Sequence, residues 1–214
     1  MKFFNTEVWG FDHALRSMRN PKNSWDRNDT VFDDYDNAII GENDMKLATT
    51  LVKAGREHGK FMRMIHVAVD VDMPRYWWSE ADTYKFGTRN SCSTMHKLLN
   101  NNNPITLDMF VSCEEDAVWW EMTVNKLEGL RKEYKEIQKT TKDAKAMNRL
   151  LVRAKRMLPE GFLQLRTWDT NYAELRNVYL QRNKHPLKEE WVDTFCEWVK
   201  TLPYAEELII CGGK

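Results

Sequence analysis

The chain has 214 residues, which is long enough to bury the core of one domain. Its 32 Lys and Arg residues balance 32 Asp and Glu residues. A general nucleic-acid binder is therefore not expected, because such proteins need a basic surface that displaces counterions. No apolar stretch approaches the roughly 20 residues that span a bilayer, and the polar N-terminus does not resemble a signal peptide. The sequence thus predicts a cytoplasmic protein without a membrane partner.

The four cysteines lack C-x-x-C spacing and the histidines are scattered singly, so no metal site is expected. Residues 20–37 are rich in Asn, Asp and Pro and predict an irregular connection. Residues 44–57 predict a helix with Asn43 or Asp44 as N-cap and with Leu47, Leu51 and Ala54 on one face.

Residues 61–71 then change to a period of two, which predicts a strand that ends at Pro74. Between residues 116 and 158 apolar residues recur every three or four positions, which predicts two antiparallel helices joined near residues 139–145. A strand is predicted at 162–168, followed by helices at 173–182 and 189–201. This order indicates an α+β fold, and neither a Rossmann fingerprint nor a P-loop is present.

Three polar groups stand out, and each has a purely structural alternative. His58 could cap a helix C-terminus or contact a ligand. The segment 75–96 could cradle a phosphate with its hydroxyls, amides and cations, or could be an ordinary polar loop. Asn171 could cap the following helix or contact a ligand. Lys155 lies in a last helical turn, where a cation complements the helix dipole.

In chain order these residues resemble the flavin-dependent thymidylate synthases. That family has a cation-x-x-Leu-Pro segment, a strand, and a helix that opens N-x-R-x-L with an Asn and an Arg further along. The matching residues are Lys155, Leu158, Pro159, Asn171, Leu175, Asn177 and Arg182. Glu57-His58-x-x-Phe61 likewise resembles the family's E-H-x-x-F motif. The resemblance covers most of residues 44–200.

The family signature R-H-R-x-x-S-x-N-E-x-S-x-R-Y fits residues 83–96 only in part. Lys85, Thr88, Asn90 and Ser93 occupy the third Arg, first Ser, Asn and second Ser positions. Thr83 and Tyr84 replace the leading Arg-His, Ser91 replaces the Glu, Met95 and His96 replace the final Arg-Tyr, and Ala173 replaces the helix Arg. Because charge-assisted contacts hold phosphate, Arg89 or Arg75 would have to replace the lost cations.

The resemblance implies a single domain over residues 1–214, with a central antiparallel sheet, flanking helices and a helical hairpin insertion at about 116–158, as in thymidylate-synthase-complementing proteins. It implies reductive methylation of dUMP to dTMP with methylenetetrahydrofolate, FAD and NADPH, in a homotetramer with shared active sites. The implied cofactor-binding residues are His58, Lys85, Thr88, Asn90, Asn171 and Asn177. The implied substrate-binding residues are Glu80, Arg89, Ser91, Ser93, Lys155 and Arg182.

No side-chain nucleophile is implied by this chemistry, because the cofactor carries the redox steps. Two alternatives stay open. One is a binding protein or repurposed homologue that keeps the fold without the chemistry, which the substituted signature favours. The other is a flavin-free enzyme that modifies nucleotides on the same scaffold.

Overall fold

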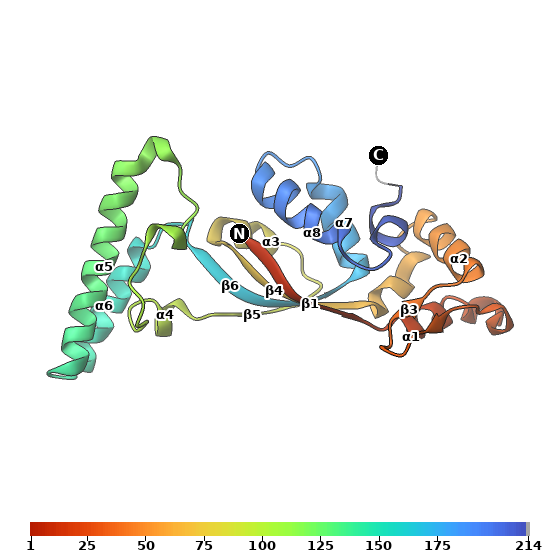
Figure 1. Ribbon diagram of the computed structural model, residues 1–214, viewed down its shortest axis with the longest axis horizontal. Helices are drawn as coiled ribbons and strands as arrows, with labels where there is room; N and C mark the ends of the chain where they lie inside the picture. Colours follow the sequence, from red (N-terminus) through yellow and green to blue (C-terminus); the bar gives the residue numbers. More distant parts are fainter. Residues whose placement is uncertain (213–214) are drawn as a thin grey trace. The chain divides into compact units, whose positions relative to one another are not determined.

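The computed structural model describes residues 1–212, apart from the side chain of His96, and has the predicted α+β fold (Figure 1). Its main sheet is antiparallel and has four strands in the order β1-β4-β6-β5. These strands are β1 (Lys2–Trp9), β4 (His66–Pro74), β5 (Thr88–Ser91) and β6 (Leu163–Asn171). A second sheet pairs β2 (Val31–Phe32) with β3 (Ala38–Ile39) in antiparallel register.

The chain forms two compact units. The first unit contains residues 72–82 and 90–166, together with Met1, and the second contains residues 2–71, 83–89 and 167–214. The chain passes from one unit to the other within β4, β5 and β6. The predicted single-domain organisation stays a prediction, and each unit is described separately below.

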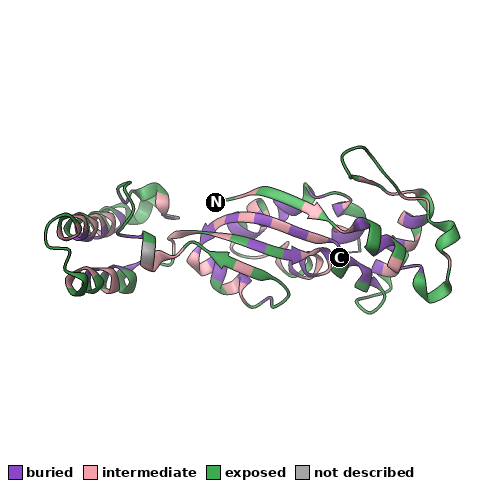
Figure 2. Ribbon diagram, turned by 90° about the horizontal axis from the view of Figure 1, so that it is seen from below, coloured by how far each residue is buried: buried purple, intermediate pink, exposed green. Residues whose placement is uncertain are grey.

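Strand β4 follows the predicted alternation. Val67, Val69 and Val71 are buried and the residues between them are half-buried, a banding that is visible along the strand in Figure 2. The strand ends at Pro74, as predicted. Its predicted start was wrong, because Gly59–Met64 is a 3₁₀ helix, η3. Phe61 and Met62 are both buried, and consecutive residues of a strand cannot face the same side.

Helix α2 spans Glu42–Lys53, so the predicted N-cap and boundaries were wrong. Gly41 occupies the N-cap position, and the carboxylate of Asp29 accepts hydrogen bonds from the first-turn amides of Asn43 (2.8 Å) and Asp44 (3.0 Å). The buried residues of α2 are Asp44, Ala48 and Val52 rather than the predicted Leu47, Leu51 and Ala54. The helix is rotated from the predicted face because Asp44 forms a buried ion pair with Arg19.

The segment predicted as a long polar loop contains three short elements: α3 (Arg75–Ala81), β5, and α4 (Thr94–Lys97). Pro74 precedes α3, where its fixed φ suits a helix start. Trp77 and Trp78 of α3 are fully buried, and the Trp78 indole donates to the carbonyl of Gln164 (2.9 Å). Burial of these two rings makes α3 part of the first unit's core.

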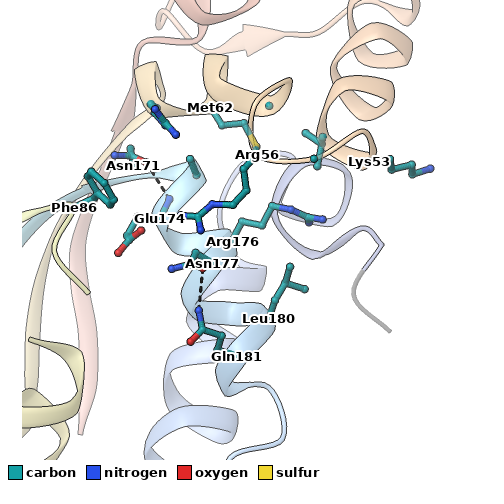
Figure 3. A pocket seen from close by; sticks show the side chains of 15 residues that line it. Lys53, Arg56, Met62, Phe86, Asn171, Glu174, Arg176, Asn177, Leu180 and Gln181 are labelled. Atoms are coloured by element: carbon teal, nitrogen blue, oxygen red, sulfur yellow. Dashed lines mark hydrogen bonds between the residues drawn. The ribbon is translucent and has the colours of Figure 1, made fainter. Parts of the chain in front are cut away.

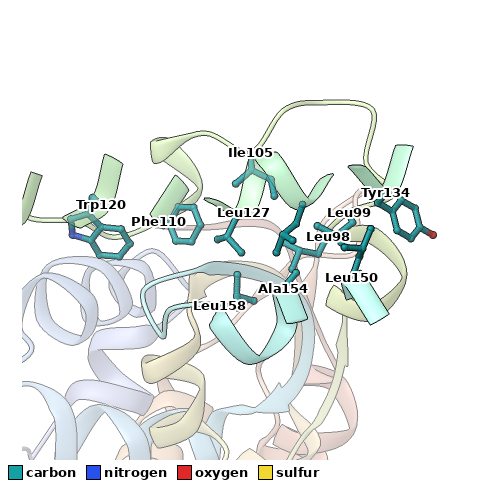
Figure 4. Close-up of a cluster of buried hydrophobic side chains, with 11 residues drawn as sticks. Leu98, Leu99, Ile105, Phe110, Trp120, Leu127, Tyr134, Leu150, Ala154 and Leu158 are labelled. Atoms are coloured by element: carbon teal, nitrogen blue, oxygen red, sulfur yellow. The ribbon is translucent and has the colours of Figure 1, made fainter. Parts of the chain in front are cut away.

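The helical hairpin has the predicted form, with α5 (Ala117–Lys139) and α6 (Ala144–Met157) lying side by side (Figure 1). Asp143 caps α6 by accepting from the amides of Lys145 (2.9 Å) and Ala146 (3.1 Å). Buried side chains from both helices and from the preceding loop meet in one cluster (Figure 4). The cluster comprises Leu98, Leu99, Ile105, Phe110, Trp120, Leu127, Leu130, Tyr134, Leu150, Ala154 and Leu158.

The second unit holds α7 (Tyr172–Arg182) and α8 (Glu197–Lys200). Besides α2 and η3, it also contains α1 (Phe11–Ser17), the 3₁₀ turns η1 (Asn20–Lys22) and η2 (Trp25–Arg27), and the π-helices η6 (Lys188–Cys196) and η7 (Glu206–Ile210). The 3₁₀ turns η4 (Leu107–Met109) and η5 (Glu114–Asp116) belong to the first unit. Trp168, Tyr172, Trp191 and Phe195 are fully buried in the second unit. Within residues 1–212, no helix has the length and apolar character needed to cross a bilayer.

Candidate functional site

A cavity of about 300 Å³ opens in the second unit (Figure 3). Its walls come from the end of α2, the turn after it, η3, the segment 83–89, and α7 from its N-cap to Gln181. The volume is at the low end of the range for small-molecule sites. The polar side chains among its lining residues are Lys53, Arg56, Arg63, Asn171, Glu174, Arg176, Asn177 and Gln181.

Asn171 lies where β6 turns into α7 and caps the helix. Its side-chain oxygen accepts a hydrogen bond from the amide of Glu174 (3.0 Å). The structural alternative for Asn171 is therefore realised, because one of the helix's unpaired first-turn donors is satisfied. Asn171 also lines the cavity, where its side-chain NH₂ group remains a possible donor to a ligand.

Further along α7, the side-chain oxygen of Asn177 accepts a hydrogen bond from the side-chain nitrogen Nε2 of Gln181 (2.9 Å). Arg176 donates to the carbonyls of Ile209 (2.6 Å) and Cys211 (2.7 Å), so its guanidinium holds the C-terminal segment beside α7. Arg56 points from the turn before η3 towards α7 (Figure 3). Together these groups make the cavity rich in donors.

Arg56 and Arg63 are exposed cations, the first in the turn before η3 and the second within η3. A cavity lined by three guanidiniums and one carboxyl, that of Glu174, favours an anionic ligand. Among the described residues, no cluster of His, Cys, Asp and Glu could hold a metal ion.

Glu174 is the acidic group of the cavity wall and is only 4% exposed. Burial raises the pKa of its carboxyl group, because desolvation disfavours the charged form. The backbone N–H of Phe86, the charges of Arg56 and Arg89, and the side chain of Asn177 act in the opposite direction and lower this pKa.

The other predicted residues of the second unit do not line this cavity. His58 is exposed and begins η3, and it does not cap α2, which ends at Lys53. Lys85 and Thr88 are exposed. Arg89 lies 4.8 Å over the ring of Trp168.

Two predicted substrate cations make contacts inside the second unit. Arg89 donates to the carbonyl of Tyr84 (3.2 Å). Arg182 donates to the hydroxyl of Tyr84 (2.8 Å) and stacks on Trp191, at 4.7 Å from the ring centre. Tyr84 occupies the position at which the family signature has a His, and it accepts hydrogen bonds from both arginines.

The remaining predicted residues lie in the first unit: Glu80, Asn90, Ser91, Ser93 and Lys155. Ser93 lines a second cavity of about 320 Å³ with Cys92, Thr94, Lys97 and Gln164, among other residues. Lys155 is exposed in the last turn of α6.

Sequence reasoning missed Arg56, Arg63, Glu174, Arg176 and Phe86. A signal existed for the first three. The two arginines flank the E-H-x-x-F motif, and Glu174 stands three residues after Asn171, the spacing of a helix capping box. Nothing in the local sequence distinguished Phe86 from a core aromatic residue.

Comparisons with known proteins identify the fold. The chain is similar to flavin-dependent thymidylate synthase ThyX from Helicobacter pylori complexed with FAD and dUMP, with 17% identity, a TM-score of 0.69 and 98% of each chain covered. A second structure of that enzyme with FAD and dUMP has 17% identity, a TM-score of 0.68, and coverage of 98% of this chain and 97% of the other.

The UMP/dUMP methylase PolB from Streptomyces cacaoi, bound with 5-Br dUMP, is similar with 14% identity, a TM-score of 0.62, and coverage of 99% of this chain and 94% of the other. No protein-family model and no curated protein sequence matches the chain. The chain therefore has the fold of the flavin-dependent thymidylate synthases over essentially its whole length, as the sequence predicted.

Proposed function

We propose that this protein is a flavin-dependent enzyme that methylates a pyrimidine nucleotide, with dUMP as substrate and dTMP as product. The observation that carries the proposal is the cationic cavity beside α7, in a fold shared over 98% of the chain with an enzyme that binds FAD and dUMP. Methylenetetrahydrofolate and NADPH would supply the carbon and the reducing equivalents. The assembly that fits this proposal is a homotetramer with shared sites.

The residues of the cavity fit part of FAD. The imide edge of a flavin presents two carbonyl acceptors and one N–H donor, and its phosphates are anionic. Arg56, Arg63 and the NH₂ group of Asn171 are donors at the cavity, and exposed guanidiniums suit phosphate. A volume of about 300 Å³ suits one ring system or one phosphate-bearing arm rather than the whole dinucleotide.

When bound, the flavin would supply hydride chemistry, and this chain's residues would bind and orient the ligands. Asn171 is positioned for this by its capping bond, which restricts its side chain to one rotamer at the strand–helix junction. Arg176 is held by two carbonyls, so its charge stays near the cavity wall without a ligand. Such preorganised groups lose little conformational entropy on binding.

A second candidate is a repurposed nucleotide-binding homologue without the methylation chemistry. The contacts of Arg89 and Arg182 with Tyr84 favour it, because both arginines that were predicted to bind substrate are engaged within the protein. Binding a nucleotide phosphate through either one would require these contacts to be exchanged.

The first experiment is the absorbance spectrum of the purified, desalted protein between about 300 and 550 nm, with and without added FAD and dUMP. We expect flavin bands that remain with the protein, bleach with NADPH and are followed by dTMP formation when methylenetetrahydrofolate is added. A protein that binds dUMP but retains no FAD would exclude the first candidate and support the second.

The cationic cavity is tested with Arg56→Gln and Arg63→Gln, with Lys60→Gln as the matched control. Lys60 is also exposed and lies on η3 between the two arginines, but it does not line the cavity. Each charge-assisted contact contributes about 1.5–3 kcal/mol, so each cavity variant should weaken FAD binding about 10- to 150-fold. Equal effects of all three variants would show that overall charge, rather than this cavity, attracts the ligand.

A further inference from the structure

Phe86 is an exposed aromatic residue on a rigid backbone. Its side chain is 62% exposed and stands at the edge of the cationic cavity (Figure 3). One exposed apolar side chain needs no explanation by itself. Here, however, the backbone beneath the ring is fixed from several directions.

The first contacts are made by the two polar backbone groups of Phe86. Its carbonyl accepts a hydrogen bond from the hydroxyl of the buried Thr170 (3.2 Å). Its N–H acts on the carboxyl group of Glu174 and lowers the pKa of that group, which burial raises. Both partners flank the β6–α7 junction, so the segment that carries Phe86 is bound to the same element as the cavity wall.

The next residue, Gly87, fits too closely for any side chain. A Cβ atom at this position would lie 2.7 Å from the carbonyl oxygen of Asp169 and 2.7 Å from the indole nitrogen of Trp168. Trp168 is fully buried and cannot give way. Glycine therefore permits the backbone to approach β6 closely enough for both contacts of Phe86.

The burial of Glu174 and the exposure of Phe86 are each unfavourable for the stability of the fold. A carboxyl group is buried, at a desolvation cost, and its backbone contact holds an apolar ring that stays in water. A fold selected for stability alone would bury the ring and expose the acid. Local conflicts of this kind concentrate at functional sites.

We propose that Phe86 is a stacking platform for the planar ring of the ligand that binds in the cationic cavity, and that Glu174 is the positioning residue that holds it. The inference rests on the proposed function, which supplies two planar, anionic ligands: FAD, through its isoalloxazine ring, and dUMP, through its uracil ring. Aromatic side chains stack on either ring, and the neighbouring guanidiniums of Arg56 and Arg63 complement the phosphates.

The direct test titrates FAD and dUMP separately into the full-length protein and into Phe86→Ala and Phe86→Trp variants. Stacking of this kind changes affinity about 5- to 150-fold, so Phe86→Ala should weaken binding of one ligand by that factor. Phe86→Trp should bind the same ligand as tightly as the wild type or more tightly, and should quench flavin fluorescence if that ligand is FAD. Phe32→Ala is the matched control, because Phe32 is also an exposed aromatic of the second unit and lies outside this cavity.

The role of Glu174 is tested by a double-mutant cycle with Glu174→Ala. If Glu174 acts through Phe86, its replacement weakens binding in the wild-type background and has little further effect when Phe86 is already Ala. Glu174→Gln should restore part of the affinity, because an amide oxygen still accepts from the Phe86 N–H. Thermal unfolding of each variant checks that the fold is retained.

The outcomes separate the two proposals. If the wild type binds FAD or dUMP and Phe86→Ala binds both as tightly, the stacking inference is overturned and the proposed function stands. If the wild type binds neither ligand, the proposed function fails and the inference fails with it. Additive effects of the Glu174 and Phe86 replacements would overturn the positioning role of Glu174.

Discussion

The buried ion pair between Arg19 and Asp44 provides the sharpest test of how α2 is held. The two side chains are 3% and 0% exposed. The Oδ1 atom of Asp44 accepts from Nε of Arg19 (2.7 Å) and lies 2.5 Å from its Nη2. The Oδ2 atom accepts from the Thr30 hydroxyl (2.6 Å) and from the amides of Thr30 (3.1 Å) and Asp29 (3.2 Å). One carboxylate therefore satisfies donors from three residues.

Asp44→Asn keeps the shape and removes the charge. In either orientation the new NH₂ group faces donors, and the guanidinium of Arg19 stays buried without a counter-charge. Breaking a buried pair in this way costs about 3–5 kcal/mol. For a chain of this length each kcal/mol lowers the melting temperature by roughly 2–4 °C, so we expect a decrease of about 6–20 °C.

The assay is thermal unfolding, for the melting temperature, and urea unfolding, for the free energy of unfolding, of the wild type, Asp44→Asn and the control Asp12→Asn, whose carboxylate is exposed. Adding Arg19→Met to Asp44→Asn removes the unpaired charge, so the double variant should be more stable than Asp44→Asn alone. A double variant that is less stable than the single one would refute the reasoning. The lost hydrogen bonds to Thr30 and Asp29, rather than the unpaired charge, would then dominate.

Two further predictions concern titration and thiol reactivity. Burial raises the pKa of Glu174 above its ordinary 4.5, so the native state binds this proton more tightly than the unfolded state. The wild type should therefore gain stability relative to Glu174→Gln as the pH falls from neutral towards 4.5. Urea unfolding at several pH values checks this, and parallel stability profiles of the two proteins would contradict it. Burial also raises the pKa of the Cys196 thiol to about 12, whereas Cys92 is exposed, and the carboxylate of Asp116 raises the pKa of the exposed Cys113 thiol. Native-state alkylation followed by mass spectrometry should therefore modify Cys92 first, Cys113 more slowly and Cys196 only after unfolding; early labelling of Cys196 would disprove its burial.

The elements predicted best are those whose apolar pattern is local. The alternation of Val67, Val69 and Val71 encodes a strand with one buried face, and the three- and four-residue spacing around Leu127 and Leu150 encodes the helical hairpin. Asn171 is an effective cap in any context, because its side chain reaches the next turn without help from the rest of the fold. Such patterns need no information about distant residues, so the sequence by itself determined these elements.

Other features depend on partners that are distant in the sequence. The local sequence predicts that Asp44 is a surface N-cap. In the structure Asp44 pairs with Arg19, and that contact rotates α2. The local sequence predicts an unpaired cation at Arg182, but Tyr84, 98 positions earlier, accepts its hydrogen bond. The local sequence does not distinguish Phe86 from a core aromatic residue, but in the structure the Thr170 hydroxyl binds its carbonyl and the ring stays exposed. The position of a polar side chain depends on its partner, and the position of an exposed ring depends on how its backbone is held. Only the tertiary structure therefore decided which residues line the cavity.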